Sequence, residues 1–285
     1  MRFEALATFA VLSLTAPLFA AALAPDELAR FAADWKRWHD ARIERLRGPQ
    51  GWLALSGLQW LEPGPNRLEG LPGVFELDGD QVTFRAEEKD GWTLSGAPVS
   101  TRVLASDKQG RPDRIVRGPI AVQLIDRGAK LGLRSWDAES AARTSFAELE
   151  TFPVDPRWQL EARWEPYAVP REVLVPSVIG VPTKELAPGR VHFLLDGVEQ
   201  TLEPVLEDGA LFFVFKDKTA PRETYGGGRF LYADPPKDGV VRLDFNRAVN
   251  PPCVFTNYAT CPLPLPQNQL PIRVEAGEKV WGHGH

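Results

Sequence analysis

Apolar side chains recur at helical spacing in one segment near the N-terminus, between Asp26 and Arg47. Acidic residues open this segment, arginines close it, and Gly48-Pro49 follows it, which matches the charge order and the stop signal of an α-helix. The pattern therefore predicts one amphipathic helix whose apolar stripe packs against the rest of the protein. The residues of that stripe are Leu28, Phe31, Trp35, Trp38, Ile43 and Leu46.

Beyond Gly51 the apolar positions form short or alternating runs bounded by Gly, Pro, Asp or Asn, which is typical of β-strands. Short turn sequences between these runs favour antiparallel hairpins at Asp78-Gly79-Asp80, Arg127-Gly128-Ala129, Asp196-Gly197 and Asp208-Gly209. The predicted strands are Gly73–Leu77, Gln81–Ala86, Val99–Leu104, Ile120–Asp126, Lys130–Trp136, Gln159–Trp164, Arg171–Val175, Arg190–Asp196, Val198–Leu206, Ala210–Lys216, Arg229–Ala233 and Val240–Phe245.

No helical segments alternate with these strands, which argues against a doubly wound sheet or a (β/α)-barrel. We expect a mainly β protein, an antiparallel barrel or sandwich that carries the N-terminal helix. Since no Ser/Gly-rich linker or change of composition divides the chain, residues 23–285 are expected to form a single β-rich domain.

The first residues have the pattern of an export signal. Arg2 precedes an uncharged apolar run that extends from Ala5 to Ala22 and ends in small residues. Because Pro17 interrupts this run, a cleaved signal peptide over residues 1–22 is favoured over a membrane anchor. No later stretch is long and apolar enough for a membrane span, so we expect a periplasmic or secreted protein with no span in the mature chain.

That compartment changes the interpretation of the two cysteines, Cys253 and Cys261. An oxidising environment favours a disulfide between them. Closing so short a loop contributes roughly 2.6 kcal/mol in the chain-entropy model. The alternative, a catalytic thiol, would need a histidine close by.

Composition and charge exclude several classes of function. Hydrophobic residues make up 44% of the chain and charged residues 25%, which excludes a disordered protein. With 33 Lys and Arg against 38 Asp and Glu, the net charge of −5 argues against nucleic acid as a partner. Motifs for phosphate loops, dinucleotides, nucleophile elbows and zinc are absent from the sequence. Two of the four histidines are His283 and His285 at the extreme C-terminus, so we expect no metal and no cofactor.

Polar residues are concentrated in the C-terminal third. A run of three glycines, Gly226 to Gly228, lies between Tyr225 and Arg229 and would let a ligand approach the main chain. Asp244 and Asn246 fall on one face of their strand by the period-two rule. The leading hypothesis is a site for a small polar or anionic molecule. Its candidate ligand-binding residues are Arg127, Arg134, Asp137, Asp217, Arg229 and Asn246.

If that site is catalytic, the residues favour a metal-independent hydrolase. Asp244 or Glu278 would act as general base, Tyr225 as proton donor, and an arginine would stabilise the oxyanion. A second hypothesis is a non-catalytic envelope protein, in which the same polar residues form a buried network that braces the proline-rich segment from Asn250 to Pro271. Carbohydrate recognition is a third possibility, suggested by the nine tryptophans.

The C-terminal motifs resemble an uncharacterised bacterial family, the domain-of-unknown-function family 1684. The matching runs are Thr224-Tyr225, Gly228 to Leu231, Asp244 to Cys253, Cys261 to Pro264, Asn268 to Leu270 and Ala276 to Lys279. Similarity also extends upstream through Gly51 to Leu53, Arg127, Gly132 to Arg134, Asp137 and Phe152 to Val154. Ala220-Pro221 departs from the family pattern, which has a glycine after this turn. The resemblance implies a single β-rich domain and no established activity.

Overall fold

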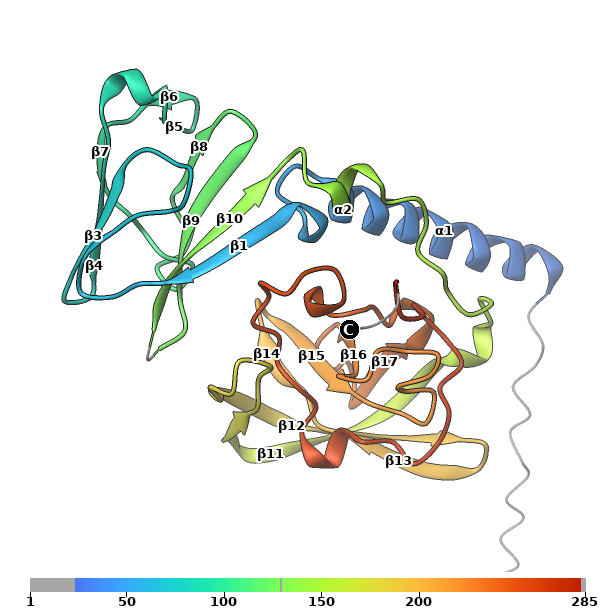
Figure 1. Ribbon diagram of the computed structural model, residues 1–285. Coiled ribbons are helices and arrows are strands. Elements are labelled where there is room, and N and C mark those ends of the chain that lie inside the picture. The colour runs from blue at the N-terminus through green and yellow to red at the C-terminus, as the bar shows by residue number, and fades with distance from the viewer. Residues whose placement is uncertain (1–23, 129, 283–285) are drawn as a thin grey trace, which may run out of the picture.

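The computed structural model describes residues 24–128 and 130–282, so the predicted signal peptide at residues 1–22 lies outside the described residues. The chain forms one long helix and two β lobes, which we call the first lobe (residues 55–137) and the second lobe (residues 159–282) (Figure 1). Each lobe has its own hydrophobic core. Whether residues 23–285 behave as a single domain stays a prediction.

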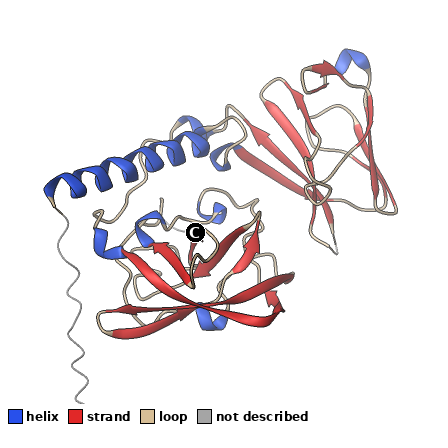
Figure 2. Cartoon of the chain, turned by 180° about the vertical axis from the view of Figure 1, so that it is seen from behind, coloured by secondary structure: helices blue, strands red, loops and turns tan. Residues whose placement is uncertain are grey.

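Helix α1 spans Pro25–Arg47 and confirms the predicted amphipathic helix. It lies along one side of the second lobe and leads toward the first (Figure 2). The indole Nε1 of Trp35 donates a hydrogen bond to the carbonyl of Asn246 at 2.9 Å. Trp38 packs against the hydrophobic cluster of the second lobe that includes Phe212 and Phe230, and Leu46 is fully buried. The apolar stripe therefore attaches the helix to the strands, as amphipathicity predicts.

Two antiparallel sheets pack face to face in the first lobe. Their strand orders are β1-β10-β9-β8-β5-β6 and β2-β3-β4-β7. Phe75, Phe84, Trp92, Ile115 and Leu133 fill the space between them. The strands are β1 Leu55–Trp60, β2 Gly64–Asn66, β3 Val74–Asp78, β4 Gln81–Arg85, β5 Thr93–Leu94, β6 Ala97–Pro98, β7 Thr101–Val103, β8 Arg114–Arg117, β9 Ile120–Asp126 and β10 Leu131–Asp137.

The second lobe also has two sheets, with the orders β13-β12-β11-β17 and β14-β15-β16. Its core includes Phe213, Phe215, Phe245, Val191 and Leu243. The strands are β11 Gln159–Val175, β12 Thr183–Leu195, β13 Val198–Leu202, β14 Val205–Glu207, β15 Ala210–Phe215, β16 Arg229–Ala233 and β17 Val240–Asp244.

Short helical turns connect these strands. The segment from Asn250 to Pro271 contains no helix longer than a 3₁₀ turn and contributes no strand to a sheet, as its prolines predict. It covers the outer face of β15, and its two cysteines, Cys253 and Cys261, form the predicted disulfide. The turns are helix α2 Ala141–Thr144 and the 3₁₀ turns Trp52–Ala54, Glu88–Asp90, Pro156–Trp158, Phe245–Arg247, Pro252–Val254 and Pro266–Asn268.

The mainly β antiparallel fold is confirmed, with sandwich-like lobes rather than a closed barrel in the part of the chain that the structure describes. All four predicted hairpin turns join antiparallel neighbours. Several strand predictions were wrong in their bounds. Gln159–Trp164 and Arg171–Val175 are one strand, β11, whose pairing with β12 shifts between Pro166 and Arg171. The strand predicted over Val198–Leu206 instead divides between β13 and β14, because Glu203 and Pro204 interrupt it.

Among the described residues, no helix combines the length and the apolar character that crossing a membrane requires.

Candidate functional site

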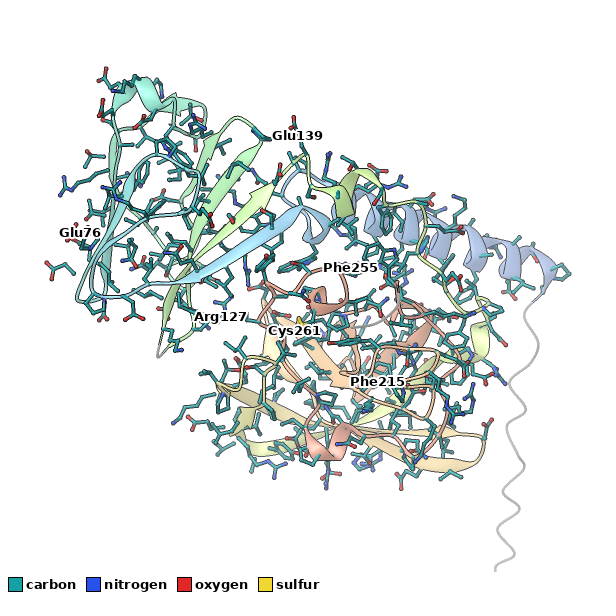
Figure 3. The ribbon with its side chains drawn as sticks, in the orientation of Figure 1. Glu76, Arg127, Glu139, Phe215, Phe255 and Cys261 are labelled. Atoms are coloured by element: carbon teal, nitrogen blue, oxygen red, sulfur yellow. A yellow bond between two sulfur atoms is a disulfide. The ribbon has the colours of Figure 1, made fainter. Side chains whose placement is uncertain are left out.

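A cleft of about 830 Å³ lies between the two lobes. The first lobe contributes Arg127 from the β9–β10 hairpin, together with Asp107. The second lobe contributes Thr260, which precedes the disulfide residue Cys261, and the strands β12, β14 and β15. Figure 3 shows Arg127 extending from the end of β9 toward the loop that holds Cys261. This volume is in the range of small-molecule sites, about 300–1,000 Å³.

Arg127 connects the two lobes at the edge of this cleft. Its Nη1 donates to Asp107 at 2.8 Å and its Nε donates to the Thr260 hydroxyl at 3.1 Å. Its Nη2 makes no hydrogen bond with any described residue, and 19% of the side chain is exposed. Arg127 therefore keeps donor capacity for a ligand in the cleft.

Arg134 lies behind Thr260, in the middle of β10, and is only 6% exposed. Its Nη2 is 3.5 Å from the hydroxyl oxygen of Thr260, longer than an ordinary N–H···O bond. Its Nε is buried and has no partner among the described residues. The guanidinium lies over the ring of Trp52, 5.4 Å from its centre, but an aromatic face replaces only part of the lost hydration.

No carboxylate of the described chain forms an ion pair with Arg134. Burial lowers the pKa of Arg134 to about 10, together with repulsion from Arg127 and Arg114, while the carboxylate of Asp107 acts in the opposite direction. The side chain is therefore still charged at neutral pH. A buried charge without a partner costs several kcal/mol, so this position is unfavourable unless an anion compensates it.

A third guanidinium, that of Arg114 on β8, strengthens the positive field. Its partners are the neutral amides of Gln123 and Gln50, and its guanidinium lies over Trp136 at 4.7 Å. Among the three guanidinium groups of Arg114, Arg127 and Arg134, the carboxylate of Asp107 pairs with that of Arg127. In a chain whose net charge is −5, this is a local excess of positive charge.

The Thr260 hydroxyl shows where an anion would sit. Its oxygen accepts from Arg127 at 3.1 Å and makes the longer contact of 3.5 Å with Arg134. The hydroxyl proton has no acceptor among the described residues. An anion in the cleft would accept this proton and lie next to two guanidinium groups.

The opposite wall of the cleft is apolar. Phe212 and Val214 of β15 lie there with Val205 and Leu265, all of them buried. At the rim, Leu174 is 59% exposed and Leu206 is 43% exposed.

The predicted residues Asp217 and Arg229 lie elsewhere and pair with each other. Both are nearly fully buried, and Nη2 of Arg229 is 3.2 Å from Oδ1 of Asp217. The same guanidinium donates to the carbonyls of Val274 and Ala276, while Asp217 accepts from the amide of Val274 at 2.6 Å. Burial lowers the pKa of Arg229, and Asp217 opposes that shift. These contacts fix the C-terminal segment against the core.

Gly228 allows Arg229 to enter the core. Its φ is +93°, and a Cβ there would lie 2.6 Å from the carbonyl oxygen of Phe215. This is a position that only glycine fits. The glycine run therefore serves a close backbone contact.

Glu278 and Asn246 also contact the main chain. Glu278 is buried, with one oxygen 3.0 Å from Nε of Arg42 and the other accepting from the amide of Asn250 at 2.6 Å. Asn246 exchanges two hydrogen bonds with the backbone of Asp155 and donates to Asp244 at 3.0 Å. Both residues thus hold separate segments together.

Tyr225 and Asp137 lie apart from these groups. Tyr225 packs in the cluster that contains Phe255 and Trp281. Asp137 accepts a hydrogen bond from the amide of Glu139 at 2.8 Å, just before helix α2.

The structure therefore brings the predicted residues to several places rather than to one pocket. Arg127 alone among them lines the cleft, and Arg134 reaches it through Thr260. The roles assigned to the others stay predictions. The sequence carried no signal for Thr260, because its contact with Arg134 joins residues 126 positions apart. No three His, Cys, Asp or Glu side chains are grouped for metal binding in residues 24–128 and 130–282.

Fold and site define a mainly β, two-lobed protein whose cleft has Arg127 at one edge and carboxylates along the wall of β12 and β14. Residues 144–279 match the model of a family described as "Protein of unknown function (DUF1684)". The chain belongs to this family, which confirms the family predicted from the sequence. The matched segment covers most of the second lobe and includes Phe152 to Val154, whereas the resemblance from Gly51 to Asp137, including Arg127 and Arg134, lies outside it.

A similar solved structure is the solution NMR structure of an uncharacterized protein of Haloarcula marismortui. The two sequences are 31% identical over 48% of this chain and 79% of that chain, with a TM-score of 0.41. A comparison with curated proteins found no match.

Proposed function

We propose that this protein is an exported binding protein for a small anionic molecule, which it holds in the cleft between its lobes. The observation that carries the proposal is the buried guanidinium of Arg134, which has no carboxylate partner among the described residues and lies behind an available Thr260 hydroxyl. Arg127 would contact the anion from the cleft edge. A bound anion would accept hydrogen bonds from Thr260 and the guanidinium groups, which are strong when charge-assisted.

Export supports this function and is itself part of the proposal. The apolar run that ends at Ala22 is the pattern of a signal peptide, and the Cys253–Cys261 disulfide is consistent with an oxidising compartment. A binding protein there would meet its ligand outside the cytoplasm.

The contacts favour binding over hydrolysis. A hydrolase that used Asp244, Tyr225 and Glu278 would need them around one substrate, whereas Glu278 is engaged by Arg42 and Asn250. The hydrolase hypothesis stays a prediction that turnover assays with ester and amide substrates would test. The hydrogen bonds that Asn246, Asp217 and Arg229 make within the protein instead support the alternative of a non-catalytic protein.

The test is a titration of the mature protein with sodium sulfate and sodium acetate at constant ionic strength, followed by calorimetry and by the unfolding temperature. We expect saturable binding that Arg134→Met and Thr260→Val each weaken at least about tenfold, since a charge-assisted hydrogen bond contributes about 1.5–3 kcal/mol. Arg102→Gln is the matched control, because Arg102 pairs with Asp113 and does not line the cleft. Equal binding by the wild type and the Arg134 variant would contradict the proposal.

A further inference from the structure

The residues that line the cleft indicate the chemistry of the whole ligand, beyond its charged group. We infer that the ligand is a monocarboxylate with an extended apolar body, whose carboxylate binds at Arg127 and Thr260 and whose body lies on the wall formed by β14 and β15. This inference rests on the proposed anion site and deepens it. Three observations on the lining residues carry it.

The first observation is the character of the wall next to the cations. Phe212, Val214, Val205 and Leu265 form a continuous part of one hydrophobic cluster and also line the cleft. Leu174 and Leu206 extend this surface to the rim, where they are exposed to solvent. Covering such side chains with an apolar ligand is favourable, by about 25 cal/mol for each Å² removed from water.

The second observation limits the number of negative charges. Glu185, Glu207 and Asp208 line the cleft from β12, β14 and the following turn. Burial and repulsion from the other two carboxylates raise the pKa of Glu207, while a hydrogen bond from Tyr232 opposes the shift. Of the two lysines that line the cleft, Lys184 on this wall is already paired with Glu172 at 2.9 Å, and Lys108 belongs to the first lobe beside Arg127. A second anionic group on the ligand would meet uncompensated negative charge there.

The third observation is size. The cleft of about 830 Å³ is far larger than acetate or sulfate requires. A head group at Thr260 would leave most of this space to the remainder of the molecule. The anion site alone therefore does not account for the volume of the cleft.

The experiment compares acetate, hexanoate, decanoate, decanedioate and decanol as ligands of the mature wild-type protein, using calorimetric titration below their micelle-forming concentrations. We expect decanoate to bind at least about tenfold tighter than hexanoate, because each fully buried methylene increases affinity about threefold to fourfold. Decanol, which lacks the carboxylate, and decanedioate, which carries a second one, should each bind at least about tenfold more weakly than decanoate.

Substitution of the rim tests the location of the body. The double variant Leu174→Gln and Leu206→Gln should weaken decanoate several-fold and leave acetate unchanged. Both residues are largely exposed, so the fold is expected to tolerate the change, and an unfolding curve verifies it. Leu194→Gln is the matched control, since Leu194 is 65% exposed and does not line the cleft.

The outcomes separate the two proposals. If acetate and decanoate bind equally well, and both need Arg134, the apolar body is wrong and the anion site remains. If decanedioate binds as tightly as decanoate, the restriction to one charge is wrong. Should no carboxylate bind at all, the proposed function itself fails.

Discussion

Two arginines are buried among the residues that the structure describes, one in each lobe, and their surroundings differ. Arg229 is 1% exposed and Arg134 is 6% exposed, and each guanidinium lies over an aromatic ring, that of Phe215 or Trp52. Arg229 has a carboxylate and two backbone carbonyls as partners, whereas Arg134 has one long contact with a hydroxyl.

The difference separates a structural charge from a functional one. A paired and hydrogen-bonded charge can be buried as part of the core, and removing its partner is then strongly destabilising. A buried charge without a partner destabilises the fold and is typical of a site whose partner arrives from outside. The same residue type therefore has opposite expected mutational effects in the two lobes.

The largest effect is expected on removing the partner of Arg229. Asp217→Ala leaves a buried guanidinium without its carboxylate and the amide of Val274 without its acceptor. We expect a loss of about 3–5 kcal/mol in the free energy of unfolding, measured by urea denaturation. A double variant, Asp217→Ala with Arg229→Met, should recover part of this loss. If the single variant loses less than about 1 kcal/mol, the structural role of the pair is wrong.

The next largest effect is expected on removing the disulfide, and this change should also affect the cleft. Thr260 lies between Cys253 and Cys261, next to the second cysteine. The double variant Cys253→Ala with Cys261→Ala should lose about 2.6 kcal/mol of stability by the chain-entropy model. It should also weaken sulfate binding, because Thr260 is held less firmly. A variant that loses stability but keeps full affinity would show that the disulfide does not position Thr260.

An intermediate effect is expected at Asn246. Its amide side chain bonds to the backbone of Asp155 and to Asp244, so Asn246→Ala should lose about 1–3 kcal/mol of stability. Anion affinity should stay within about twofold of the wild type, since Asn246 does not line the cleft. Calorimetry on the folded variant checks this. A selective loss of binding with unchanged stability would instead support the ligand-binding role predicted from the sequence.

The sequence predicted those parts of the fold that depend on local pattern. Helix α1 has its charges and apolar stripe within one segment, and each hairpin has its turn residues next to its strands. In strand β15 the pattern of apolar and polar residues could not predict which face packs against which cluster. Phe212 and Val214 are buried on one face while Phe213 and Phe215 are buried on the other, so no polar alternation marks its two environments.

The site was less predictable because its contacts join distant segments. Arg127 and Arg134 could be chosen as ligand-binding candidates from the sequence, but Thr260 comes from the other lobe. Asp217 and Arg229 were candidates for the same ligand, yet they satisfy each other. A sequence shows that a charge is present, and only the folded chain shows whether that charge already has a partner.

A small effect on stability is expected at Arg134 itself. Arg134→Met removes an unpaired buried charge and keeps an unbranched side chain over Trp52. Without ligand, we expect a stability within about 1 kcal/mol of the wild type, or higher, because apolar replacement of buried charges is often neutral or stabilising. Urea denaturation in a buffer free of sulfate and carboxylates checks this. A loss above about 3 kcal/mol would place Arg134 in the same class as Arg229.

The smallest effect concerns His39, whose imidazole has a buried nitrogen and can lose its charge by releasing a proton. Its Nε2 has no partner among the described residues, and its ring stacks on Trp35 at 4.8 Å. Burial lowers the pKa of His39, and repulsion by Lys36 and Arg42 acts in the same direction, although Glu278 and Asp40 oppose it.

Because the folded-state pKa is the lower one, the unfolded chain binds the proton of His39 first as the pH falls. The stability gained by keeping His39 neutral is complete above about pH 6.5 and is lost as the pH drops through the folded-state pKa. His39→Phe keeps the stacking and removes this titration, so the variant should gain on the wild type between pH 7.5 and pH 5 by less than about 1 kcal/mol, since the site is partly exposed. Unfolding curves at the two pH values measure the difference. An unchanged difference would mean that the folded-state and unfolded-state pKa values of His39 are equal. A gain would show that the folded protein holds His39 neutral, in contrast to the guanidinium of Arg134, which stays charged.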